Sequence, residues 1–296
     1  MKISSIIIII QNHVFGKTFF VIFFRHFKKR LKGHKMGMFA NCHRVVVKVG
    51  TSTLTHETGH LNLRRIEEIV KILSDLKNTG KEIVLVSSGA VSAGVAKLGL
   101  GHRPHDTAEK QATAAVGQNE LMKLYSRLFS DYGITVGQIL MTKDVFENAD
   151  RRNNAENTID ALLKMGCVPI VNENDSVATH ELNFGGNDYL AAYVALVCHA
   201  DILLNLSDVD GLYNKDPRKH DDAAIIERVE NIDEVFGHAG GNGTERGTGG
   251  MKAKLEAARI VTEAGIPMFI MNGHTPELLY SLLDGLHVGT YFTAKK

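Results

Sequence analysis

A lysine stands inside an apolar stretch near the start of the globular part of the sequence. The run Val45–Val49 predicts a buried strand that carries Lys48, and Gly50-Thr51-Ser52 follows it directly. A buried, unpaired lysine is costly, so Lys48 is expected to have an anionic partner. The competing interpretation is a lysine at a strand end whose ammonium group reaches water. The glycine and the hydroxyls favour an anion site, because glycine lets a phosphate approach the backbone and hydroxyls donate to it.

Two further segments have the composition of anion-binding turns. Ser87-Ser88-Gly89-Ala90 begins a helix after an apolar strand, and a helix N-terminus attracts anions, although a plain N-cap explains these residues equally well. Thr248–Lys254 combines a glycine loop with a helix start and the lysines Lys252 and Lys254. That combination suits a nucleotide phosphate, and a solvated loop is the alternative.

Acidic and amide side chains gather in three other segments. They are Asn172-Glu173-Asn174-Asp175, Gly185-Gly186-Asn187-Asp188 and Ser207-Asp208-Val209-Asp210. The first segment follows an apolar strand, and four consecutive polar residues there are unusual for structure alone. The first two segments could hold an ammonium group or orient lysines, while Asp188 also suits a helix N-cap and the third segment suits an ordinary turn.

Alternating strands and helices must position these segments. Apolar and β-branched runs predict strands at 45–49, 83–86, 136–140, 168–171, 202–206 and 268–270. Helical spacing predicts helices at 66–76, 107–129, 154–165 and 251–264, the second of them broken near Gly117. The alternation implies an α/β fold with a mostly parallel sheet and helices on both faces. Ligands of such sheets bind beyond the carboxyl ends of the strands, which is where the polar segments lie.

Composition excludes several classes of protein. The chain has 296 residues, a net charge of +1 and three separated cysteines, so neither nucleic acid as a partner nor a disulfide framework or zinc site is indicated. The cysteine content fits a reducing cytoplasm. The sequence has no GxxxxGK[ST] loop, no GxGxxG after the first strand, no HRD or DFG and no GxSxG. If phosphate is bound, another architecture binds it.

Residues 1–40 form an N-terminal extension of different composition, with apolar runs at 6–10 and 19–24 and then a basic stretch. One interpretation is a membrane anchor, although polar residues interrupt the apolar stretch below the ~20 residues of a membrane span. A second is that translation starts at Met36 or Met38, and a third is a disordered or docked extension. Membrane contact is expected only if the extension is real.

The order of the motifs is more specific than any one of them. VVKVGTS, SSGAV, VNENDSVAT, FGGNDYLAA, NLSDVDGLYNKDPR and GTGGMKAK follow one another along the chain. In this order they resemble the amino acid kinase superfamily and, within it, the glutamate 5-kinase family, over roughly residues 44–293. The resemblance implies a three-layer αβα sandwich around a mainly parallel sheet, in a kinase domain at 41–296. It also implies an ATP- and Mg²⁺-dependent phosphotransferase that converts L-glutamate to γ-glutamyl phosphate, the first intermediate toward proline.

The resemblance also implies roles for individual residues. Lys48 and Lys254 match catalytic lysines that contact the transferring phosphate, and Asp188 matches an aspartate that organises them. Ser88, Asp175 and Asn187 match positions that bind glutamate. The residues that match the ATP-binding segments are Lys48, Ser207, Asp208, Thr248, Gly249, Gly250, Met251, Lys252, Ala253 and Lys254. No residue is expected to form a protein metal site.

The chain departs from the family pattern in two places. Gly186 stands where the family usually has an acidic residue near the substrate amine, and no C-terminal PUA domain follows the kinase domain. The family implies a homo-oligomer, a dimer or tetramer, in the cytoplasm, and proline feedback stays open. One alternative is another kinase of the superfamily, acting on acetylglutamate, aspartate, carbamate or a nucleoside monophosphate. The other is a non-catalytic sensor of glutamate or proline.

Overall fold

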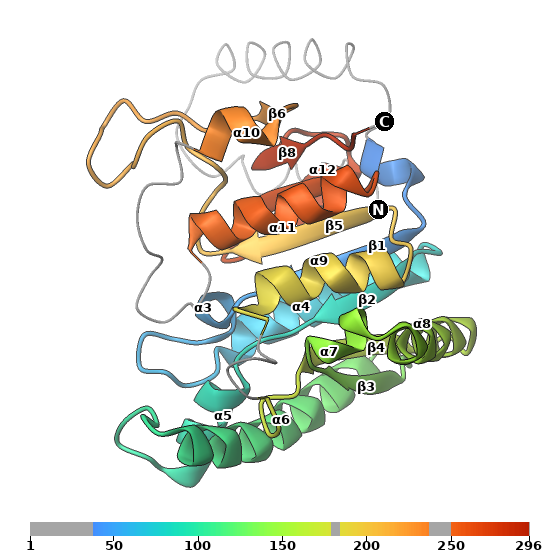
Figure 1. Cartoon of the computed structure of the whole chain (residues 1–296), viewed down its shortest axis with the longest axis vertical. Helices are drawn as coiled ribbons and strands as arrows, with labels where there is room; N and C mark the ends of the chain where they lie inside the picture. Colours follow the sequence, from blue (N-terminus) through green and yellow to red (C-terminus); the bar gives the residue numbers. More distant parts are fainter. Residues whose placement is uncertain (1–37, 179–183, 237–249, 296) are drawn as a thin grey trace, which may run out of the picture.

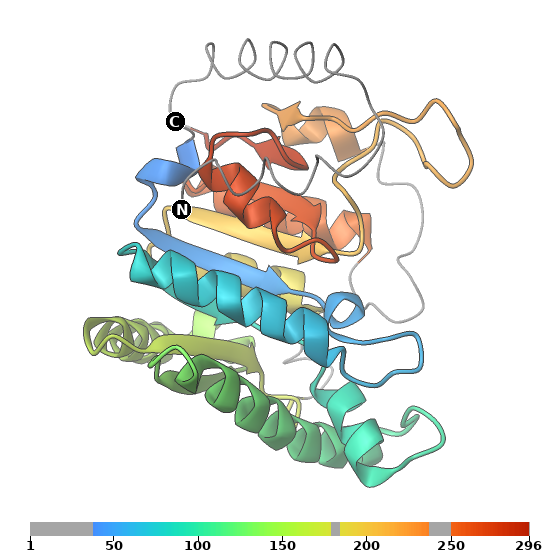
Figure 2. The same ribbon diagram turned by 180° about the vertical axis from the view of Figure 1, so that it is seen from behind.

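The computed structural model describes residues 38–178, 184–236 and 250–295, so Thr248, Gly249 and nearly all of the N-terminal extension lie outside it. An eight-stranded sheet runs through the molecule with helices on both faces (Figures 1 and 2). The strands are β1 (Arg44–Val49), β2 (Glu82–Val86), β3 (Val136–Met141), β4 (Val168–Glu173), β5 (Ile202–Ser207), β6 (Arg228–Val229), β7 (Met268–Asn272) and β8 (Thr290–Phe292). Their order is β3-β4-β2-β1-β5-β7-β8-β6.

The sheet is parallel from β3 to β7, and β8 then pairs antiparallel with β7. The mainly parallel α/β fold expected from the sequence is thereby confirmed. The predicted strands all exist within a few residues of their expected bounds. The short strands β6 and β8, which lie at one end of the sheet, were not predicted, because two or three residues are too few to show a period.

The helices divide between two hydrophobic cores, one on each face of the sheet. One core holds α4 (Leu63–Asn78), α5 (Ala90–Leu98), α6 (Thr107–Ser130) and α12 (Leu278–Leu283). The other holds α8 (Ala149–Lys164), α9 (Asn187–Val197) and α11 (Met251–Glu263). The short helices are η1 (Met38–Asn41), α3 (Thr51–Leu54), α7 (Asp144–Glu147) and α10 (Ile232–Val235).

Strand β1 shows how the alternation of side chains directs Lys48. Val45, Val47 and Val49 belong to the first core, whereas Val46 belongs to the second. Because side chains alternate between the faces of a strand, Lys48 lies on the same face as Val46, toward α9 and α11. The alternation of the strand therefore directs the side chain of Lys48 toward the helices that begin with Asn187 and Met251.

Two helix predictions were wrong in part. Helix α6 is continuous from Thr107 to Ser130, without the expected break at Gly117. A Cβ added to Gly117 would lie 1.7 Å from the backbone oxygen of Ala90, so the glycine permits close packing of α6 on α5. Helix α8 begins at Ala149, before the expected Asn154, because the side chain of Asn148 caps it by accepting from the backbone N–H of Arg151.

Candidate active site

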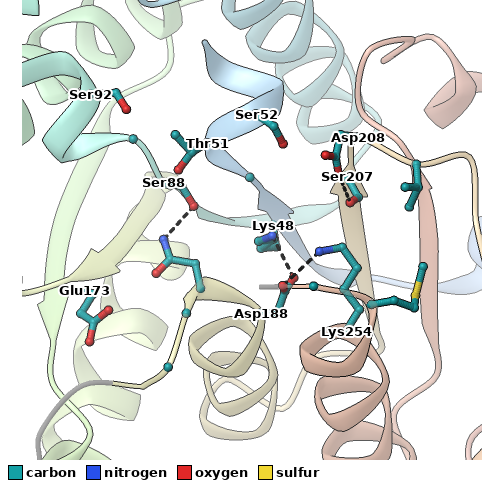
Figure 3. Close-up of a pocket in the computed structure, with 18 of the residues that line it drawn as sticks. Lys48, Thr51, Ser52, Ser88, Ser92, Glu173, Asp188, Ser207, Asp208 and Lys254 are labelled. Atoms are coloured by element: carbon teal, nitrogen blue, oxygen red, sulfur yellow. Dashed lines mark hydrogen bonds and ion pairs between the residues drawn. The ribbon is translucent and has the colours of Figure 1, made fainter. Parts of the chain in front are cut away.

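A cleft of about 700 Å³ opens at the carboxyl ends of β1, β2, β4 and β5. The segments that follow these strands line it together with the first residues of α5, α9 and α11 (Figure 3). This is the edge at which parallel α/β sheets bind ligands. Segments that are far apart in the sequence meet here because each follows or begins a neighbouring element.

Lys48, Asp188 and Lys254 form one buried ionic cluster in this cleft (Figure 3). The Nζ atom of Lys48 lies 2.8 Å from one carboxylate oxygen of Asp188, and the Nζ atom of Lys254 lies 3.2 Å from the other. The three residues are only 2–5% exposed. Asp188 is thus the anionic partner that the buried position of Lys48 requires.

The electrostatics of the cluster keep Asp188 ionised. Burial on its own would raise the pKa of Asp188, but the charges of Lys48 and Lys254 and the hydrogen bonds outweigh it and lower the pKa to about 2. Burial lowers the pKa of Lys48, an effect that Asp188 opposes and Lys254 reinforces. With both lysines protonated, the cluster carries one net positive charge. A buried positive charge next to an open cleft favours an anionic ligand.

Asn205 completes the cluster from the neighbouring strand. Its Nδ2 atom donates to Asp188 over 2.7 Å, and its backbone pairs in register with Lys48. Sequence reasoning missed this residue. The available signal was a polar side chain inside the apolar strand 202–206, the same signal that identified Lys48.

One half of the cleft has the features of a phosphate and nucleotide site. Gly50, Thr51 and Ser52 follow β1, and Gly250 and Met251 begin α11. Ser207 and Asp208 follow β5, where the Ser207 hydroxyl donates to the Asp208 carboxylate over 3.0 Å. The cleft extends along 211–213 and 215–218, which were not among the predicted site residues.

The other half of the cleft is built from side-chain amides and carboxylates. The Nδ2 atom of Asn187 lies 2.8 Å from the Ser88 hydroxyl and 2.9 Å from the side-chain oxygen of Asn172. Glu173 and Asp175 line the same half. Burial raises the pKa of both carboxyl groups, and the charge of Asp175 adds to the effect on Glu173. The backbone N–H of Phe184 donates to Oε1 of Glu173 over 3.0 Å, and within the described ranges neither Glu173 nor Asp175 has an ion pair within 4.0 Å.

Two cationic side chains lie close enough to these carboxylates to affect their pKa values. Arg103 and Lys110 line the cleft, and both charges act to lower the pKa of Asp175 against the effect of burial. Neither residue was predicted, because a lysine in the first turn of α6 and an arginine in the preceding loop have no distinguishing pattern. Glu173 belonged to a predicted polar segment but was not singled out.

Most of the predicted site residues meet in this cleft. Those that line it are Lys48, Ser88, Asp175, Asn187, Asp188, Ser207, Asp208, Gly250, Met251 and Lys254. Lys252 and Ala253 are not among the residues that line it, and Lys252 is exposed, because the helical turn of α11 points Lys254 inward and Lys252 outward. Thr248 and Gly249 lie outside the described residues, so their roles stay predictions.

Gly186 has a backbone reason to be glycine. It precedes α9 with a φ of +129°, a conformation that residues with a side chain rarely adopt. Asp188 does not act as the N-cap side chain, since α9 begins at Asn187 without a side-chain cap. The N-cap interpretation of Asp188 was therefore wrong, and its carboxylate faces the lysines.

The described part of the chain contains no group of three or more His, Cys, Asp or Glu residues placed to hold a metal ion. Mg²⁺ often keeps several waters and is held by substrate phosphates with one or two carboxylates. The residues present fit a Mg²⁺ ion of that kind, for which Asp208 on the phosphate side is a suitable ligand. In the same described ranges, no helix is long and apolar enough to cross a membrane.

Comparisons with known proteins identify the family of the chain. Residues 43–272 match the model of the amino acid kinase family. The chain is 51% identical over 258 residues to glutamate 5-kinase of Clostridium perfringens, covering 86% of this chain and 96% of the relative. It is 47% identical over 261 residues to that of Listeria innocua, covering 86% and 95%.

Solved structures of the same fold are more distant in sequence. A structure of isopentenyl phosphate kinase superposes with a TM-score of 0.59 at 16% identity, covering 85% of this chain and all of that one. UMP kinase from Bacillus anthracis superposes with a TM-score of 0.58 at 19% identity, covering 86% and 97%. The fold, the paired lysines of the cleft and the close relatives together show that this chain belongs to the amino acid kinase family, in its glutamate 5-kinase branch.

Proposed function

We propose that the protein transfers the terminal phosphoryl group of ATP to the γ-carboxylate of L-glutamate, giving γ-glutamyl phosphate and ADP, the first step of proline biosynthesis. The observation that carries the proposal is the buried cluster in which Asp188 bridges Lys48 and Lys254 beside an open cleft. The glutamate 5-kinase relatives support the choice of acceptor.

The reaction requires little acid–base chemistry from the protein. The γ-carboxylate of glutamate has a reference pKa of about 4.3 and is ionised at neutral pH, so it attacks without a general base. A carboxylate oxygen forms the new bond to the terminal phosphorus, and the bond from phosphorus to the β–γ bridging oxygen breaks. The electron pair of that bond leaves on ADP.

The difficulty is to bring two anions together, which positive charge in the cleft relieves. Lys48 and Lys254 would neutralise charge on the transferring group, and Asp188 would hold the two ammonium groups apart and aimed at it. A Mg²⁺ ion bound with the nucleotide would offset further phosphate charge. Asp208 would hold that ion, directly or through water.

The acceptor half of the cleft suits an amino acid. Glu173 and Asp175 offer carboxylates to an α-ammonium group, and Arg103 and Lys110 offer positive charge to an α-carboxylate. The positive and the negative group of the amino acid would thus each have side chains of the opposite charge in the cleft. This arrangement also supplies an ammonium site in a chain that has Gly186 instead of an acidic residue.

The test is an ATP-consumption assay with a panel of acceptors: L-glutamate, L-aspartate, N-acetylglutamate, carbamate and UMP, with hydroxylamine to trap an acyl phosphate. We expect turnover and hydroxamate formation with L-glutamate. Turnover only with another acceptor would assign the chain a different reaction. Glutamate binding by calorimetry without any ATP turnover would support the sensor alternative.

Three finer properties belong to the same proposal. We expect a homo-oligomer, a dimer or tetramer, and a cytoplasmic enzyme. Sedimentation and cell fractionation would test these properties. Repeating the panel with L-proline would test for feedback inhibition.

A further inference from the structure

A chain of side-chain amides leads from the interior of helix α6 to the acceptor half of the cleft. The Oε1 atom of Gln118 accepts from Nδ2 of Asn172 over 2.8 Å. The Oδ1 atom of Asn172 accepts from Nδ2 of Asn187 over 2.9 Å, and the same Nδ2 lies 2.8 Å from the hydroxyl oxygen of Ser88. Gln118 is 9% exposed and does not itself line the cleft.

Backbone groups determine which way each amide faces. The backbone N–H of Glu173 donates to Asn172 Oδ1 over 2.9 Å, so this end of Asn172 must be its oxygen. The backbone oxygen of Ser87 lies 2.5 Å from Asn187 Nδ2, so that end of Asn187 must be its nitrogen. Because a backbone N–H only donates and a backbone carbonyl only accepts, the direction of the chain is unambiguous.

The direction of the chain has a consequence for Ser88. The Ser88 oxygen accepts from Asn187, so its own hydrogen is available to a ligand in the cleft. Nδ2 of Asn187 has two hydrogens for three acceptors, namely Ser87, Ser88 and Asn172. The position of this amide therefore depends on where Asn172 is held, and the partner that holds the far end of Asn172 is Gln118.

The helix packing explains why Gln118 reaches this place. It follows Gly117, where α6 approaches α5 so closely that no side chain fits. The close approach brings Gln118 to the carboxyl end of β4, where its side chain contacts Asn172. The glycine therefore supports the cleft indirectly, through the residue beside it.

We propose that Gln118 is a positioning residue that acts through Asn172 and Asn187 to set the Ser88 hydroxyl as a donor to the acceptor carboxylate. The inference rests on the proposed function, because it assigns the ligand of Ser88. Gln118 does not line the cleft and so touches neither substrate nor phosphate. Its loss should weaken the binding of the acceptor and leave the binding of the nucleotide unchanged.

The experiment compares three variants of the full chain in the glutamate assay. Gln118→Met removes the acceptor atom with little change of shape, whereas Gln118→Glu keeps an acceptor oxygen there. Tyr125→Phe is the matched control, because Tyr125 is buried in the same helix and its hydroxyl lies 2.9 Å from the side-chain hydroxyl of Ser87, whereas Asn187 contacts the backbone oxygen of that residue. Crystal structures of the substrate-free wild type and Gln118→Met provide a readout that needs no substrate.

We expect Gln118→Met to raise KM for L-glutamate about tenfold, which corresponds to about 1.4 kcal/mol, with KM for ATP unchanged. Gln118→Glu and Tyr125→Phe should keep KM for L-glutamate near the wild-type value, and the Gln118→Met crystal should show Asn187 shifted from Ser88. An unchanged KM in Gln118→Met, or an equal rise in Tyr125→Phe, overturns the proposal. If the wild type does not turn over glutamate, the proposed function fails, while an unmoved Asn187 in the crystal separately refutes the amide chain.

Discussion

Asp188 offers the most direct test of how the cleft is built. The substitution Asp188→Asn keeps the shape of the side chain but removes the charge that bridges Lys48 and Lys254. Removing one partner of a buried ion pair costs about 3–5 kcal/mol when the other charge stays buried. Asparagine keeps one oxygen for a lysine, so the lower end of that range is expected.

The pKa of Asp188 provides a second estimate of the stability that its charge contributes. Its lowering from 3.8 to about 2 corresponds to about 2 kcal/mol of stability from the ionised form. A lowered pKa means that this contribution is present above pH 3.8 and is lost as the pH falls toward 2. Taking both estimates, we expect Asp188→Asn to lose about 3 kcal/mol at pH 7 and roughly 6–12 °C in Tm.

Urea unfolding followed by far-UV circular dichroism measures the loss, since the chain has no tryptophan to report by fluorescence. The difference in the free energy of unfolding between Asp188→Asn and the wild type should narrow as the pH falls below about 4. The affinity of Asp188→Asn for ATP should stay the same or rise, because the cluster becomes more positive. Turnover should be lost, because no carboxylate orients the two lysines.

Asp175→Asn is the control within the same cleft. Burial raises the pKa of Asp175, so its charge does not stabilise the fold and the neutral variant should unfold with at least the wild-type free energy. It should weaken glutamate binding. The reasoning is refuted if Asp188→Asn unfolds like the wild type and still turns over.

Three further changes test other parts of the structure. Lys254→Ala should abolish turnover but still fold, because Asp188 keeps Lys48 and Asn205 as partners; near-normal γ-glutamyl hydroxamate formation by this variant would contradict the role of Lys254. Lys110→Met should raise KM for L-glutamate several-fold with unchanged KM for ATP, as weakened attraction for the α-carboxylate requires, and an effect on ATP instead would place Lys110 elsewhere in the mechanism. Gly117→Ala should lower the free energy of unfolding by about 1–3 kcal/mol or more, because its Cβ would overlap the backbone of Ala90, and a wild-type urea midpoint would show that α5 and α6 are not packed so closely.

The sequence was sufficient to predict the mainly parallel sheet and the edge of the sheet at which the cleft lies. Apolar runs identify strands wherever both faces are buried, and the polar residues after them must gather at one edge. The cost of burying Lys48 also predicted an anionic partner before any partner was known.

Only the tertiary structure decided which residues fulfil these requirements. Asp188 becomes the partner of Lys48 because β1 alternation and the placement of α9 bring them to 2.8 Å, a contact that no local pattern encodes. Gln118 and Asn205 act on the cleft from a helix interior and a strand interior, where an amide has no local signature. Gly117 suggested a helix break because propensity is a local property, whereas the reason for the glycine is the backbone of a different helix.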